Sequence, residues 1–142
     1  MSVQLKNLFA NQPVSTTMNG VSGGPRALLR IEAGLVLIAA LFTYHGMGGD
    51  WGLFALLFLL PDLSMLAYLV NPRVGAASYN FAHNYALALV ICGLGVALAM
   101  PLLVQCGLIW IGHVGFDRAL GYGLKYASAF GDTHLGRIGR AG

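Results

Sequence analysis

Four long runs of apolar residues make up most of the chain, and short polar or glycine-containing segments separate them. The runs cover about residues 27–45, 51–70, 78–99 and 102–120. Each approaches the roughly 20 residues that an α-helix needs to cross a bilayer. The helices of a soluble bundle would carry polar stripes, whereas residues 53–60 and 86–100 are apolar on every side. The pattern therefore predicts four membrane-spanning helices.

The connections between these runs are short. They comprise residues 46–50, residues 71–75 and the Met100-Pro101 pair. Short connections force neighbouring helices to run antiparallel. The predicted fold is therefore an all-α, membrane-embedded, up-down-up-down four-helix bundle over residues 27–120.

The two ends of the chain are polar and differ in charge from the runs between them. Residues 1–26 are rich in Ser, Thr, Asn and Gln, which predicts a flexible segment without the apolar core of a signal peptide. Residues 121–142 form a basic tail. All basic residues fall on the side that holds both ends and the middle connection: Lys6, Arg26, Arg30, Arg73, Arg118, Lys125, Arg137 and Arg140. The positive-inside rule then predicts a membrane protein with both termini in the cytoplasm.

Composition supports the same environment. The chain is 57% hydrophobic and only 9% charged, against the ~25% charged residues of a typical soluble domain. The net charge of +3 does not indicate nucleic-acid binding, because the basic residues form no dense patch with interleaved aromatic residues. The lipid bilayer is therefore the expected partner, and the apolar outer faces also suit other membrane subunits or self-association.

Ionisable residues lie inside the predicted spans, where each costs about 2.5–3.5 kcal/mol on insertion scales. The helical rise places Asp62, His83, His113 and Asp117 within about 5–12 Å of the cytoplasmic helix ends, in one layer. His113 and Asp117 are four residues apart and so share a helix face. Mixed imidazole and carboxylate ligands favour zinc, manganese or iron, so the leading hypothesis is a metal site with Asp62, His83, His113 and Asp117 as ligands.

Two other interpretations of this layer stay open. His83 and His113 at similar depth would suit the axial ligation of a b-type haem. Alternatively, the layer is a hydrogen-bonded network that fixes helix packing in a non-catalytic subunit of a larger membrane complex. If a metal ion is bound with an open position, it would activate water for hydrolysis of a lipid-like or amphiphilic substrate.

The tail carries further candidates for chemistry. Asp132, Thr133 and His134 lie between glycines that permit sharp turns, so the tail could fold back beneath the bundle. Asp132 and His134, with Asp117, are then the candidate catalytic acid–base residues. The alternative is a plain basic tail held at anionic lipid by its arginines.

Several segments resemble a family of small bacterial membrane proteins that is classed as a domain of unknown function, of the DUF4260 type. The segments are PDLSML (61–66), AHN (82–84), HVGFDR (113–118), GYGLKY (121–126) and DTHLGR (132–137). The resemblance extends over about residues 28–139. It implies a four-helix protein of the bacterial inner membrane and brings no reaction with it.

Overall fold

The computed structural model describes residues 20–139, and most of the predicted N-terminal segment 1–26 lies outside this range. The helical elements in chain order are α2 (Gly23–Gly46), α3 (Trp51–Phe58), the 3₁₀ helix η1 (Leu60–Leu69), α4 (Pro72–Ala82), α5 (Tyr85–Ala97) and α6 (Pro101–Leu120). Two short strands follow, β1 (Asp132–Thr133) and β2 (Gly136–Arg137). The predicted all-α class is confirmed.

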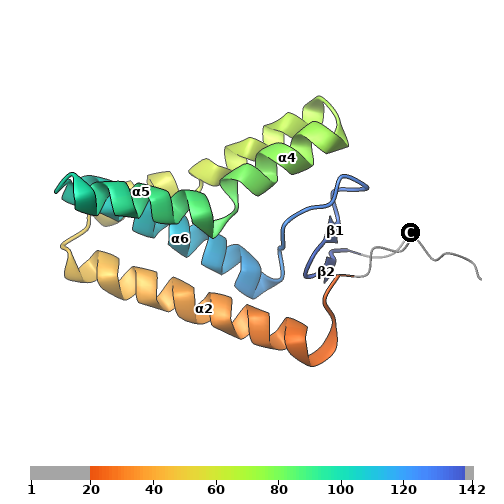
Figure 1. Cartoon of the computed structure of the whole chain (residues 1–142), viewed down its shortest axis with the longest axis horizontal. Coiled ribbons are helices and arrows are strands. Elements are labelled where there is room, and N and C mark those ends of the chain that lie inside the picture. The colour runs from red at the N-terminus through yellow and green to blue at the C-terminus, as the bar shows by residue number, and fades with distance from the viewer. Residues whose placement is uncertain (1–19, 140–142) are drawn as a thin grey trace, which may run out of the picture.

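Helix α6 is the centre of the fold. In the described chain, its contacts with α2 and with α5 are the two most extensive contacts between elements. Figure 1 shows α2 and α6 running antiparallel, while η1 and α4 form a hairpin that leans away from α2. The C-terminal strands lie between that hairpin and α2. We call the end of the molecule that holds residues 121–139 the tail end. We call the other end, which holds residues 46–51 and 98–101, the opposite end.

Three helical segments are long and apolar enough to cross a membrane: Gly23–Gly46, Trp51–Leu69 and Pro72–Ala97. The fourth predicted span, residues 102–120, corresponds to α6 and is not among them. With 20 residues α6 is about 30 Å long, which is the length of a span, but it carries Gln105, His113 and Asp117. Because α2 and α5 cover α6, its sequence can be more polar than that of a lipid-facing helix.

The second span is not one regular α-helix. Its α-helical part ends at Phe58, and the chain continues from Leu60 as a ten-residue 3₁₀ helix. Pro61 stands in the first turn of η1, where its missing backbone N–H leaves no hydrogen bond unmade. Long 3₁₀ segments are uncommon and often mark functional positions. The residue that follows Pro61 is Asp62.

The third span breaks as well, where a continuous helix over 78–99 was expected. Helix α4 ends at Ala82, His83 is its C-cap, and Asn84 begins α5 by accepting a hydrogen bond from the Leu87 N–H at 3.0 Å. A break inside a membrane is tolerated only where the freed backbone groups find partners. Asn84 Nδ2 donates to the carbonyls of residues 80 and 81 at 2.9 and 2.6 Å. Trp110 Nε1 donates to the Ala82 carbonyl at 2.6 Å, so the break is fully bonded at these positions.

The C-terminal tail docks on the helices. Asn80 makes two hydrogen bonds to the backbone of Lys125: its Oδ1 accepts from the Lys125 N–H at 2.7 Å, and its Nδ2 donates to the Lys125 carbonyl at 2.9 Å. Strands β1 and β2 pair antiparallel, with Asp132 opposite Arg137. Thr133 and Leu135 are each only 1% exposed. The alternative of an undocked basic tail therefore does not describe residues 121–139.

Candidate metal centre

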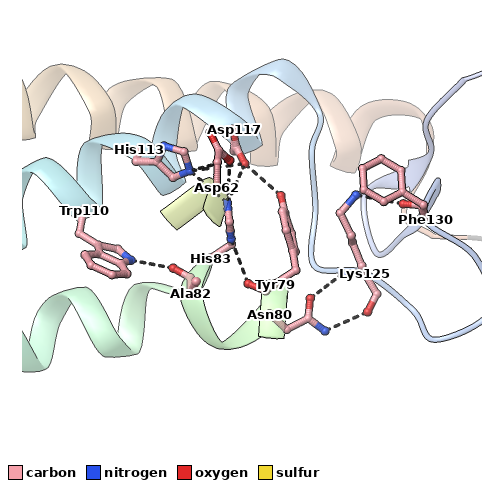
Figure 2. Close-up of polar contacts among 10 residues, drawn as sticks. All are labelled: Asp62, Tyr79, Asn80, Ala82, His83, Trp110, His113, Asp117, Lys125 and Phe130. Carbon is pink, nitrogen blue, oxygen red and sulfur yellow. Dashed lines mark hydrogen bonds and ion pairs between the residues drawn. The ribbon is translucent and has the colours of Figure 1, made fainter. Parts of the chain in front are cut away.

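The two helix breaks bring the four predicted metal ligands to one point. Asp62 comes from η1, His83 from the end of α4, and His113 and Asp117 from one face of α6. One ligand atom from each of the four lies within 4.8 Å of all the others. The histidines are 3% and 2% exposed, whereas the two carboxylates are half-buried. Figure 2 shows the four side chains converging.

Five of the six distances among these atoms are close to the edges of a tetrahedron around a metal ion. The two Nε2 atoms of His83 and His113 are 3.1 Å apart. Asp62 Oδ1 lies 3.4 Å from His83 Nε2 and 3.6 Å from His113 Nε2, and Asp117 Oδ2 lies 3.6 and 3.9 Å from the same two atoms. Metal–nitrogen and metal–oxygen bonds of about 2.0–2.2 Å imply tetrahedral edges of about 3.3–3.6 Å. These five separations differ from the tetrahedral values by only a few tenths of an ångström.

Tyr79 orients two of the four candidate ligands, His83 and Asp117. The His83 ring nitrogen Nδ1 lies 3.0 Å from the Tyr79 carbonyl, which selects the tautomer protonated at Nδ1. That tautomer leaves a lone pair on Nε2, the atom that faces the cluster. The Tyr79 hydroxyl donates to Asp117 Oδ2 at 2.9 Å, and its ring stacks on His83 at 3.7 Å between centroids. Hydrogen bonds of this kind from outside the ligand set fix metal ligands in many proteins.

His113 is held mainly by packing. Its ring meets Phe58 edge to face at 5.2 Å, and its Nδ1 has no hydrogen-bond partner within residues 20–139. A buried polar atom without a partner costs about 1–3 kcal/mol, so its position needs a compensating interaction. The Nε2 atom on the other side of the ring points into the cluster, where that compensation is available.

A pocket of about 300 Å³ opens beside the cluster. Its wall contains Asp62, Asp117 and Tyr79 on one side, and Met65, Tyr122, Lys125 and Phe130 complete it. Two of the four candidate ligands therefore face a space that is large enough for a small organic group.

The spacing of the two histidines disfavours the haem alternative. Axial ligands on opposite sides of one ion would be separated by about 4 Å, or twice a bond of 2.0–2.1 Å. The observed separation of 3.1 Å suits neighbouring positions on the same ion instead. The two carboxylates within 4 Å of the histidines also occupy the space that a macrocycle would need.

The candidate catalytic residues of the tail lie apart from this cluster. His134 Nδ1 accepts a hydrogen bond from the Leu124 N–H at 2.8 Å. Asp132 accepts from the Ser128 hydroxyl at 2.7 Å and lies 3.6 Å from Arg137 Nε. Neither residue belongs to the group of four, while Asp117 does. In the described chain Asp132 and His134 therefore shape the docked tail.

Sequence reasoning missed three residues that support the site. Tyr79 resembles an interfacial aromatic residue, but it precedes His83 by four positions and so shares its helix face. Asn80 looks like a member of a ligand stripe and instead holds the tail. Lys125 looks like a plain tail cation, yet it is only 4% exposed. The Tyr79–His83 spacing is the one signal that could have been recognised.

The comparisons with known proteins identify the family. No curated protein matches the chain, and no solved structure matches it either. A family described as a domain of unknown function (DUF4260) matches residues 26–138, which include all four members of the candidate metal centre. The chain therefore belongs to the DUF4260 family.

Proposed function

We propose that this protein is a membrane-embedded metalloprotein that binds one zinc, manganese or iron ion through Asp62, His83, His113 and Asp117. The observation that carries the proposal is the convergence of four ligand atoms within 4.8 Å from three separate helical segments. Four such groups within a membrane protein are costly without an ion, because each must be desolvated there.

The pattern of hydrogen bonds around the site favours metal binding over a purely structural network. In a network, each buried nitrogen would be expected to have its own partner. Here His83 uses Nδ1 for the Tyr79 carbonyl, so its own Nε2 carries a lone pair. This Nε2 lies 3.1 Å from His113 Nε2, and both atoms lie within 4 Å of two carboxylates. This set offers more acceptors than donors, and a cation balances such a set.

The position of the site suggests its use. The positive-inside rule places the tail end at the cytoplasm, and the pocket beside Asp62 and Asp117 would then receive an amphiphilic substrate from the cytoplasmic leaflet. A bound ion with a further, open coordination position would supply Lewis-acid polarisation and a water of lowered pKa, which is hydrolase-like chemistry. The residues of the chain would hold the ion, and the exposed side of Asp62 would leave room for a water molecule.

The test is the metal content of protein purified in a detergent from cells supplied with zinc, manganese and iron. We expect about one ion per chain, as for other sites built from four protein ligands. Asp62→Ala and His113→Ala should lower metal affinity more than the ~10–100-fold seen when a residue that merely orients a ligand is lost.

Two variants control for general effects of removing an ionisable group. His45→Ala lies at the opposite end, and Asp132→Ala lies in the tail, so both should keep the metal content of the wild type. A folded wild-type protein that holds no ion, even after reconstitution, would refute the proposal. If the Asp62→Ala and His113→Ala proteins then also failed to fold, the accessory-subunit alternative would be favoured.

A further inference from the structure

Lys125 places a buried cation in the pocket beside the candidate metal centre. Its Nζ donates to the Phe130 carbonyl at 3.0 Å and lies 3.4 Å from the centre of the Phe130 ring. It also lies 4.7 Å from the centre of the Tyr79 ring. Within residues 20–139 it forms no ion pair with a carboxylate.

This ammonium group retains capacity for an anion. An ammonium carries three donors, and one of them goes to the Phe130 carbonyl. Cation–π contacts with two rings replace part of the lost hydration, but burying a charge without a counter-ion is costly. An anionic group that enters the pocket would supply the missing partner.

The pocket connects Lys125 with the metal centre. Tyr79 stands between them in Figure 2, with His83 stacked on its ring and Lys125 lying on its other side. The same pocket is lined by Asp62, Asp117 and Lys125. A single bound group can therefore face the ligands of the ion and the lysine together, and two positive centres favour an anion with several charged oxygens, as in a phosphate.

The remaining wall indicates that this phosphate is attached to an apolar group. Met65 and Phe130 line the pocket, and Phe130 is 50% exposed. Leu66, which follows Met65 in η1, is an apolar side chain that is 62% exposed. An apolar chain attached to the phosphate would find these apolar side chains at the wall of the pocket and beside it.

We propose that the pocket binds the phosphate group of an amphiphile between Lys125 and the metal centre. The lysine half of this inference stands on its own contacts, and the metal half rests on the proposed function.

The inference is tested by equilibrium dialysis of the protein in a maltoside detergent. The ligands are radiolabelled hexyl phosphate and radiolabelled inorganic phosphate, and each is tested with metal-loaded and with chelator-stripped protein. Lys125→Met should weaken the binding of hexyl phosphate about 10–100-fold, which is the range for losing a charge-assisted hydrogen bond. Lys125→Arg should restore most of it. Arg73→Met, which removes one exposed cation from the same end, should bind like the wild type.

Lys125→Met is expected to fold, because Asn80 bonds to the backbone of residue 125 and not to its side chain. If its thermal unfolding nevertheless differs from that of the wild type, Lys125→Gln replaces it. Equal affinity for hexyl phosphate in the wild type and the folded variant, at unchanged metal content, would overturn the inference.

The remaining arms separate the two proposals and the two sources of phosphate. Binding that requires Lys125 but is the same in stripped and loaded protein would support the lysine half and reject the role of the metal. Tighter binding of hexyl phosphate than of inorganic phosphate supports an amphiphile, whereas equal binding would overturn that part.

Discussion

The two ends of the molecule differ in how their polar groups find hydrogen-bond partners. At the opposite end, most polar groups bond to near neighbours in the chain, and the bond from Gln105 Nε2 to the Met47 carbonyl at 3.4 Å is an exception. Tyr44 is fully buried and donates to the Asp50 carbonyl at 2.6 Å. Asp50 in turn caps α3 by accepting from the Leu53 N–H at 2.7 Å. Trp51 and Phe54 meet the Tyr44 ring at 5.5 and 5.3 Å. This end is a tight turn on which a cluster of aromatic rings packs.

At the tail end, polar groups bond across large distances in sequence. Asn80 holds Lys125, Trp110 holds Ala82, and Tyr79 holds Asp117. Both helix breaks lie in this half, and the break after Ala82 exposes a carbonyl that the distant Trp110 side chain then satisfies. The difference shows where irregular backbone is tolerated in a membrane protein, namely where other elements supply the hydrogen bonds. It also shows why the chemistry is expected at this end.

The largest expected effect that would sharpen this comparison is metal-dependent stability confined to the tail end. At a free metal concentration 100 times the dissociation constant, binding to the folded state adds about 2.7 kcal/mol to the free energy of unfolding. Hydrogen–deuterium exchange with and without chelator measures where the effect falls. Amides of η1, α4 and the second half of α6 should gain protection on metal loading.

The connection between α2 and α3 is the internal control, since none of the four ligands lies there. Protection that rises equally around Tyr44 would mean that the two ends form one cooperative unit. No metal-dependent change at η1 would contradict the assignment of Asp62 as a ligand.

A smaller effect on stability is expected from adding a methyl group where two helices pack closely through a glycine. A Cβ atom on Gly115 would lie 2.9 Å from the Ala33 carbonyl oxygen on α2, so Gly115→Ala must push the helices apart. Overpacking of this kind costs about 1–3 kcal/mol. Thermal or denaturant unfolding in detergent measures the loss.

Gly93 on α5 provides the matched control, because a Cβ there would meet nothing within 4 Å. Gly93→Ala should leave stability unchanged or raise it by up to ~1 kcal/mol through helix propensity. Equal destabilisation by both substitutions would contradict the packing of α2 on α6.

Much of the fold could be predicted from the sequence, because lipid imposes simple rules. The apolar runs and short connections predict the helices and their antiparallel order, and the helical rise places the ionisable residues at one depth. The four-residue spacing of His113 and Asp117 predicts that they share a face, and the structure brings these two residues together with Asp62 and His83.

The break in the third span could not be predicted in the same way. Residues 78–99 read as one helix because local propensity favours helix through His83 and Asn84, and tertiary partners decide otherwise. Trp110 and Lys125, which lie 28 and 45 residues from the groups they bond, provide those partners. Nothing in a local pattern reports bonds over such separations.

The smallest expected effect is a pH dependence of tail docking that has no counterpart at the opposite end. Burial lowers the pKa of His134 from its ordinary 6.5, and the charge of Arg118 lowers it further. Its Nδ1 also needs a free lone pair to accept from the Leu124 N–H. The undocked tail therefore binds a proton more readily than the docked tail, so docking is fully stable above about pH 6.5 and weakens as the pH falls below it.

Hydrogen exchange of the Leu124 and Leu135 amides, corrected for the intrinsic effect of pH on exchange, measures this between about pH 7.5 and 5.5. His134→Asn keeps an acceptor near the position of Nδ1 but does not titrate, so it should abolish the pH dependence while leaving the tail docked at neutral pH. Glu32 and Arg118 line the same cavity of about 160 Å³ as His134, and Asp132 lies in the adjoining hairpin. If exchange in His134→Asn rises with falling pH as it does in the wild type, Glu32 or Asp132 controls docking instead. His134 then serves only as a hydrogen-bond acceptor.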